Sequence, residues 1–139
     1  MLRSAGHGRR GLQRGAFIVE AALIVLPFLF LIFGIIEFGV VTRANNFVSY
    51  AAREGTRYAS VRGFDSGVPA SATQVSNFVK GRAVGLNSST LTVVTTWLPD
   101  NKRGSSVRVQ VSYSMPGVTG LILPRGIRVR STSQTVIYQ

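Results

Sequence analysis

The sequence predicts an α+β protein anchored in a membrane, with a long amino-terminal transmembrane helix that continues as an amphipathic rod, a short second helix and a three-stranded antiparallel sheet. Two observations predict the helices: the stretch Ala16–Ile36 is apolar apart from one residue, and apolar residues then recur every three or four positions. A third observation predicts the sheet, because apolar and polar residues alternate near the carboxyl end. We therefore divide the chain into a leader (1–15), a transmembrane helix (16–41) and a folded domain (42–139).

The composition of the 139-residue chain excludes most kinds of enzyme active site. There is no cysteine, so the chain has no disulfide scaffold, thiolate nucleophile or metal site built on thiolates. The one histidine, His7, lies in a segment rich in glycine and arginine, which excludes a histidine-based triad or a site with several histidine ligands. No paired carboxylates, Ser/Lys dyad or metal-ligand cluster is evident either. We expect a protein that is not an enzyme and that holds no cofactor or metal.

The leader, Met1–Gly15, contains four arginines, four glycines and no acidic residue. A segment so polar and so rich in glycine cannot bury enough apolar surface to form a packed element, and we expect it to be disordered. Because it directly precedes an apolar segment, its arginines are expected to hold it on the cytoplasmic side of the membrane. The folded domain is then extracytoplasmic.

The apolar segment Ala16–Ile36 contains 21 residues. As a helix it would extend about 31 Å, which is enough to cross a bilayer. A buried helix of a soluble protein is the weaker alternative, because the rest of the chain is too short and too polar to surround it. A cleaved secretion signal has a shorter apolar region, about 7–15 residues, followed by a small-x-small site that is absent here. We expect the segment to stay in the mature protein, with a kink or a freed backbone carbonyl at Pro27.

Glu20 is the one charged residue in this segment. A carboxylate inside a hydrophobic span costs roughly 3 kcal/mol, so it ordinarily has a partner. The nearest upstream arginine, Arg14, is six residues away, which does not fit the spacing of a helical ion pair. One alternative is that Glu20 extends toward the cytoplasmic headgroups. The other explanation of this carboxylate depends on the resemblance of the segment to a known class of signal.

Beyond the membrane the predicted helix has one face of small and apolar residues, which we expect to pack on the chain's own domain. That face comprises Phe38, Val41, Ala44/Asn45, Val48, Ala51/Ala52, Gly55 and Ala59. Arg53 and Arg57 share another face, with Glu54 beside them, and Glu54 and Arg57 have the spacing of an i,i+3 ion pair. Gly63 is expected to end the helix.

The rest of the chain predicts one short helix and three strands. Ser71–Gln74 has the pattern of a capping box, and the helix that it starts is expected to end near Gly85. Strands are predicted over Leu91–Trp97, Val107–Met115 and Ile127–Tyr138, with a turn at Pro99–Gly104 and loops at Phe64–Ala70 and Pro116–Gly126. Short connections between sequential strands favour a meander. We assign Trp97 and Tyr113 to the core.

The start of the chain resembles the class III signal of type IV pilins: a basic leader, Arg14-Gly15, four residues, and then Glu20 at the start of a long apolar helix. In that class a membrane-embedded prepilin peptidase cuts after the glycine. The resemblance therefore implies a cut between Gly15 and Ala16. It also implies that Glu20 pairs with the new α-amino group of Ala16, on its own or a neighbouring subunit, and so fixes the axial register of subunits.

A longer stretch, about Arg14–Arg62, resembles the amino-terminal region of TadE-like proteins, the pseudopilins of Tad (Flp-type, type IVb) pilus systems. The resemblance depends on Leu26-Pro27, Gly34, Glu37-Phe38-Gly39 and Ala51-Ala52-Arg53-Glu54-Gly55-Thr56-Arg57. The residues that it marks on the helix are Pro27, Glu37, Gly39, Arg53, Glu54 and Arg57. One departure is Ala21, where major Flp pilins typically have an aromatic residue, and this favours a pseudopilin over a main filament subunit.

This resemblance implies a pilin-like fold and a minor pilin or pseudopilin. Such a protein is processed by prepilin peptidase and used to start or cap a Tad pilus for adhesion or secretion. The implied location is the bacterial inner membrane as a single-pass protein, and the pilus after extraction. The implied partners are the inner membrane, prepilin peptidase, other pilin and pseudopilin subunits and the Tad secretion machinery.

Two other functions stay open. The first is an uncleaved single-pass scaffold of the pilus assembly machinery. The second is a pilus-associated protein that binds DNA or polysaccharide, because twelve basic residues accompany three acidic ones from Val41 onward, and Arg108, Arg128 and Arg130 are predicted to project from strands. No glycine loop or aromatic platform accompanies this charge, so nucleic acid is the less favoured partner, and an acidic assembly partner is at least as well supported.

Overall fold

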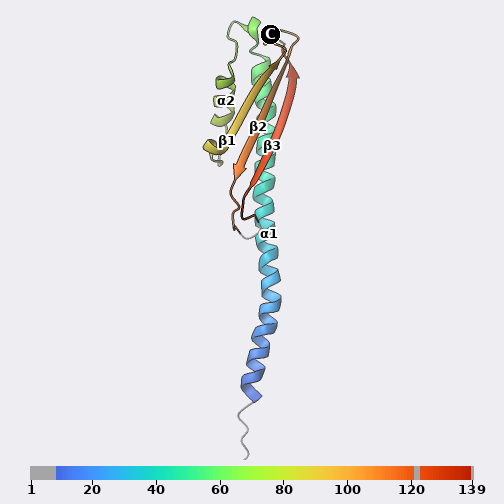
Figure 1. The fold of residues 1–139 in the computed structure, drawn as a ribbon, viewed down its shortest axis with the longest axis vertical. Coiled ribbons are helices and arrows are strands. Elements are labelled where there is room, and N and C mark those ends of the chain that lie inside the picture. Colours follow the sequence, from blue (N-terminus) through green and yellow to red (C-terminus); the bar gives the residue numbers. More distant parts are fainter. Residues whose placement is uncertain (1–8, 121–122, 139) are drawn as a thin grey trace, which may run out of the picture. The chain divides into compact units, whose positions relative to one another are not determined.

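The α+β class, the long first helix, the short second helix and the antiparallel sheet are confirmed by a computed structural model, which describes residues 9–120 and 123–138, with side chains from Gly15 onward (Figure 1). The helices are α1 (Arg9–Ser60), the 3₁₀ helix η1 (Phe64–Ser66), α2 (Ala72–Gly81) and the 3₁₀ helix η2 (Ser88–Thr90). The strands are β1 (Leu91–Leu98), β2 (Ser106–Met115) and β3 (Ile127–Val136). The chain forms two compact units, residues 1–36 and 37–139.

In the first unit, α1 presents its apolar side chains on the outside; Phe17 and Leu23, for example, are each 70% exposed. By length and composition the helix is able to cross a membrane. The predicted disorder of the leader is wrong from Arg9 onward, because α1 already begins there. Adding turns to an existing helix is far more favourable than starting one, so a long apolar helix extends into a polar neighbour. Residues 1–8 lie outside the described part of the chain.

Pro27 lies inside α1, and the helix continues through it as one element. Proline has no backbone N–H, so the carbonyl of Leu23 lacks its helical donor. The freed carbonyl that the sequence predicts is therefore present, whereas the helix is not interrupted.

The second unit has its core where α1, α2 and one face of the sheet meet (Figure 1). The buried hydrophobic residues of the two helices are Ala44, Val48, Ala51, Ala52, Ala59, Val75 and Val79, and those of β2 are Val107, Val109, Val111, Tyr113 and Met115. Most of the apolar face predicted for α1 is thus buried, but Phe38 is not, with 73% of its surface exposed. Phe38 directly follows the buried Glu37, and since adjacent helical residues point in different directions, only one of the two can face the core.

At Gly55, α1 lies close to two neighbouring elements at once. A Cβ atom there would lie 3.0 Å from Cγ1 of Val109 and 3.1 Å from Cγ2 of Val79. Both valines are fully buried, so they have little room to move. The absence of a side chain at this position therefore lets α1 contact both β2 and α2.

The sheet is the predicted meander, with strand order β1-β2-β3 and both pairs antiparallel. Inward and outward residues alternate along β2, as the sequence predicts. Tyr113 is buried, and Trp97 is half-buried and packs against the core from β1. β3 ends at Val136, two residues earlier than expected, because the N–H of Tyr138 donates to the carbonyl oxygen of Ser60 on α1 (3.2 Å) instead of to a strand.

The capping box of α2 is confirmed. Ser71 Oγ accepts from the N–H of Gln74 (3.2 Å), and Gln74 Oε1 accepts from the N–H of Ser71 (2.9 Å). The helix is shorter than expected: it ends at Gly81. Gly85 has φ +76°, so it belongs to a turn after the helix and not to the helical cap itself. In the same way α1 ends at Ser60, before the predicted Gly63.

Candidate functional site

The predicted cleavage junction, Gly15–Ala16, lies on the surface of α1, and both residues are exposed. A Cβ atom at Gly15 would meet nothing within 4 Å, and its φ is not in the left-handed region. Nothing in the described fold therefore requires glycine at this position. A requirement for glycine here would have to come from a molecule that binds the junction.

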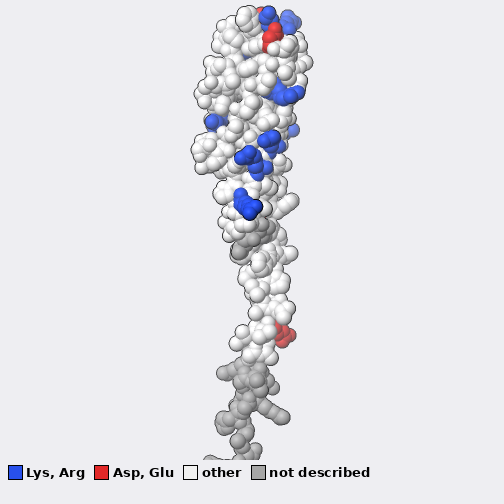
Figure 2. Space-filling model, in the orientation of Figure 1, with Lys and Arg blue, Asp and Glu red and all other residues white. Residues whose placement is uncertain are grey.

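Glu20 lies one turn beyond this junction and is exposed. It has no hydrogen bond or ion pair among the described residues. Figure 2 shows a long stretch of helix without charge apart from one acidic group, in agreement with the sequence of residues 16–36. A partner for Glu20 has to come from the solvent, a lipid headgroup, the leader or another molecule.

Gly39 is the other glycine that the resemblance marks on α1. It is exposed, and a Cβ atom on it would meet nothing within 4 Å. Neither Gly39 nor Gly15 has a packing role among the described residues. At Gly39 no side chain projects from the outer surface of the helix.

Glu37, in contrast, is 3% exposed and binds a distant loop. Its Oε1 accepts from the N–H of Val118 (3.1 Å), and its Oε2 accepts from the N–H (3.3 Å) and the hydroxyl (2.9 Å) of Thr119. A carboxylate with several N–H and O–H donors can be buried without a cationic partner. Glu37 therefore fastens the segment after β2 to the start of the second unit's helix.

Gly117 makes this contact sterically feasible. A Cβ atom there would overlap the carbonyl oxygen of Leu123 and lie 2.9 Å from Oε1 of Glu37. The loop thus folds tightly against the carboxylate at a position where a side chain does not fit. The sequence resemblance marks Glu37, but it does not indicate that residues about eighty positions later are its partners.

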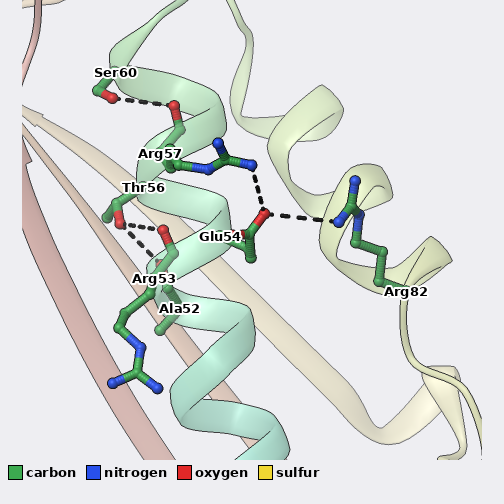
Figure 3. A network of polar contacts seen from close by, with 7 residues as sticks. All are labelled: Ala52, Arg53, Glu54, Thr56, Arg57, Ser60 and Arg82. Carbon is green, nitrogen blue, oxygen red and sulfur yellow. Dashed lines mark hydrogen bonds and ion pairs between the residues drawn. The ribbon is translucent and has the colours of Figure 1, made fainter.

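Glu54 is the centre of a second polar group, shown in Figure 3. Its Oε2 lies 3.3 Å from Nη2 of Arg57 on α1 and 3.7 Å from Nη1 of Arg82, just after α2. The i,i+3 pair between Glu54 and Arg57 that the sequence predicts is present. Arg53 is not part of it, because its guanidinium is directed away from Glu54 (Figure 3).

Two aromatic rings lie beside this polar group. Tyr58 of α1 and Phe78 of α2 are stacked, with ring centroids 4.2 Å apart. The guanidinium of Arg62 lies 4.0 Å from the centroid of Tyr58, and that of Arg82 lies 4.3 Å from the centroid of Phe78. Each arginine follows its aromatic residue by four positions on the chain. This i,i+4 spacing is the signal by which the sequence could have revealed both pairs.

These side chains surround a pocket of about 290 Å³. Its wall combines the stacked rings with three guanidinium groups, those of Arg57, Arg62 and Arg82, and one carboxylate, that of Glu54. Arg62 has no ion pair with any described acidic residue. The pocket therefore has an excess of positive charge next to an apolar surface.

The outer face of the sheet is also basic. Arg108, Arg128 and Arg130 are exposed on β2 and β3, as the sequence predicts. Arg108 donates from Nε and Nη2 to Oε1 of Gln134 (3.1 and 2.9 Å), and Arg128 donates from Nε to Oγ of Ser114 (3.0 Å). Within residues 9–120 and 123–138, no group of three or more His, Cys, Asp or Glu side chains could hold a metal ion.

Comparison with known proteins gives one match. Residues 15–57 match the family model described as TadE-like protein. No curated protein and no solved structure matches the chain significantly. The resemblance inferred from the sequence is confirmed over this segment, which contains both exposed glycines, Glu20, Glu37 and Glu54.

Proposed function

We propose, from the premise that residues 15–57 are TadE-like and that this family is involved in Tad pilus assembly, that the chain is a minor pilin or pseudopilin. Prepilin peptidase cuts it between Gly15 and Ala16. The mature protein leaves the inner membrane and starts or caps a Tad pilus that serves adhesion or secretion. Its role is non-catalytic, and its partners are the peptidase, other pilin and pseudopilin subunits and the Tad secretion machinery.

The observation that carries this proposal is the position of Glu20 on an exposed apolar helix, five residues after the exposed Gly15. A lone carboxylate in an apolar environment costs roughly 3 kcal/mol, so a helix in which it has no partner would be more stable in the membrane without it. Cleavage after Gly15 creates an α-amino group on Ala16, four residues from Glu20. An ion pair between these groups, within one subunit or between two, would remove the cost and fix the axial position of one helix against the next.

The topology that we propose follows the charge of the leader. Residues 1–15 lie in the cytoplasm, the apolar part of α1 spans the inner membrane, and the domain that follows is extracytoplasmic. In this arrangement Pro27 and Gly39 lie on the surface that other helices of the pilus contact. Glu37, Arg53, Glu54 and Arg57 belong to the part of α1 that supports the domain.

The test is the amino-terminal sequence and intact mass of the protein from its own membranes. We expect a mature chain that starts at Ala16 and an uncut chain in Gly15→Leu. Gly39→Leu is the matched control, because Gly39 is also an exposed glycine of α1, and it should be processed normally. An uncut wild-type chain would refute the proposal in favour of the membrane scaffold.

Glu20→Ala separates processing from assembly. We expect this variant to be cut at the same bond but to be absent from sheared pili, because the registry contact is missing. Asp65→Ala removes an exposed carboxylate of the folded domain, outside the α1–α2 pocket, and should still enter the pilus. Normal incorporation of Glu20→Ala would contradict the proposed role of Glu20 without affecting the proposed cleavage.

The outer face of the sheet supports one further candidate, a pilus-associated protein that binds an anionic polymer. Arg108, Arg128 and Arg130 are exposed there in adjacent strands. Binding of this kind weakens steeply as salt concentration rises. A filter-binding assay with DNA and with polygalacturonate at about 50 and 200 mM salt tests it, and binding that is absent at the lower salt concentration excludes it.

A further inference from the structure

We infer that the pocket between α1 and α2 is a docking site for an acidic side chain of another protein of the assembly. The pocket lies between Glu54, Arg57, Tyr58, Arg62, Phe78 and Arg82. Nothing in the TadE-like match assigns a role to it, since the match ends at residue 57 and four of these six residues come later or from the other helix. The pocket lies entirely within the second unit.

The charge of the pocket points to a carboxylate. Three guanidinium groups line the pocket, and the one carboxylate in its lining neutralises one of them, which leaves an excess of two positive charges. Glu54 Oε2 is already between Arg57 and Arg82, at 3.3 and 3.7 Å. Arg62 has no described acidic partner, and its planar group has five N–H donors. A carboxylate that enters the pocket can therefore bind Arg62, which lines it together with Arg57 and Arg82.

The aromatic stack makes the pocket a formed site and not only a group of surface charges. Arg62 and Arg82 lie over the rings of Tyr58 and Phe78, at 4.0 and 4.3 Å from the centroids. Stacking holds a guanidinium plane in place and so reduces the side-chain entropy that a bound anion would otherwise have to remove. The rings also give an apolar wall, against which the methylene groups of a glutamate can pack.

The size of the pocket favours a protein side chain over a polysaccharide. About 290 Å³ is at the lower end of the volumes of ligand sites. Such a pocket accommodates one or two side chains, whereas an acidic polysaccharide presents a row of sugar rings. A second copy of this chain is a poor occupant, because from Ala16 onward the chain has twelve basic and five acidic residues, and two such copies repel each other. The occupant is therefore a different, acidic chain; that it belongs to the pilus assembly rests on the function proposed above.

The test uses the full-length protein in a non-ionic detergent and a rhodamine-labelled hexaglutamate peptide, with binding followed by fluorescence anisotropy. We expect saturable binding that Arg62→Gln weakens by about fivefold, the effect of one exposed ion pair at the upper end of the usual range. Arg125→Gln is the matched control. It removes the same charge from an exposed turn before β3, outside the pocket, and should change the affinity by less than about twofold.

A second measurement on the wild-type protein does not depend on the folding of a variant. The Nε–Hε signals of Arg57, Arg62 and Arg82 should shift in NMR spectra when the peptide is added, while that of Arg125 should not. Equal weakening by both variants, shifts on the sheet instead of the pocket, or no binding would overturn the inference. The inference would also be overturned if oligogalacturonate displaced the peptide at concentrations as low as those at which the peptide binds. Cleavage at Gly15 is measured separately, by the amino-terminal sequence. A failure of peptide binding would therefore leave the proposed cleavage standing, and an uncut chain would not by itself exclude binding of the peptide.

Discussion

Replacing Glu37 by glutamine should release the loop after β2 while the rest of the second unit stays folded. The carboxylate accepts three hydrogen bonds, one at Oε1 from Val118 and two at Oε2 from Thr119. Glutamine keeps one acceptor oxygen, and its NH₂ group has to face either the N–H of Val118 or the two donors of Thr119. At least one hydrogen bond to a charged group is lost, and a donor is placed against a donor.

A hydrogen bond to a charged group contributes about 1.5–3 kcal/mol. We take about 2 kcal/mol as the loss in the free energy of loop opening, which corresponds to roughly 30-fold faster exchange of the amide protons that the carboxylate protects. The assay is hydrogen–deuterium exchange at Val118 and Thr119 in the detergent-solubilised full chain, with the amides of β2 as an internal reference. Local opening should accelerate exchange in the loop and leave β2 unchanged.

Glu54→Gln is the matched control for this experiment. It makes the same change of a carboxylate to an amide in the same helix, but Glu54 contacts Arg57 and Arg82 and not the loop. Its exchange at Val118 and Thr119 should equal that of the wild type. If Glu37→Gln also leaves these two amides protected, then the carboxylate does not hold the loop. If exchange rises equally in β2, the Glu37 carboxylate stabilises the whole domain and not only the loop.

Two further predictions concern packing and pH. Gly55→Leu should lower the free energy of unfolding by about 2–3 kcal/mol, because even a Cβ atom would crowd Val109 at 3.0 Å. Gly39→Leu is the control: its side chain would lie in open space on the same helix and should not change this free energy. Urea denaturation followed by circular dichroism measures both variants. The hydroxyl of Ser105, which donates to Asp100 Oδ1 (2.5 Å), lowers the pKa of Asp100, assisted by the N–H of Lys102. Because the folded-state pKa is the lower one, the stabilisation is present above the unfolded pKa and is lost as pH falls through the folded value. Ser105→Ala should raise the pKa of Asp100 in an NMR titration, and an unchanged pKa would contradict the assignment of the hydroxyl as its main cause.

The sequence predicted best what depends on neighbours along the chain. The capping box Ser71–Gln74, the alternation of β2 and the ion pair of Glu54 with Arg57 each involve residues at most four positions apart, or a simple repeat. Such patterns have the period of the helix or the strand, so the local geometry is contained in the spacing. The meander followed from short connections in the same way.

The sequence did not predict contacts between distant elements. Glu37 was marked only by resemblance, since its partners follow it by eighty-one and eighty-two positions. Arg82 meets Glu54 because α2 packs beside α1, and no spacing within one helix encodes that. Element ends were also missed. After Gly81 of α2 the N–H of Arg82 donates to Val79 three residues back, as in a turn, and beyond Val136 of β3 the N–H of Tyr138 donates to Ser60 of α1.

The structure divides the TadE-like segment into residues with contacts inside the chain and residues without them. Glu37 and Gly55 belong to the first group, since one binds a loop and the other permits close packing. Gly15, Glu20 and Gly39 belong to the second, because all three are exposed and no described residue contacts the place of a side chain on either glycine.

This division decides which variants report on assembly. A substitution in the first group changes the folding of the domain, so a loss of pili in such a variant has two explanations. A substitution in the second group should leave the free energy of unfolding of the isolated protein unchanged, and a defect in processing or incorporation then has to arise from a partner. If Gly15→Leu or Glu20→Ala destabilised the detergent-solubilised chain, the exposed residues would have contacts within it, and the argument for external partners would fail.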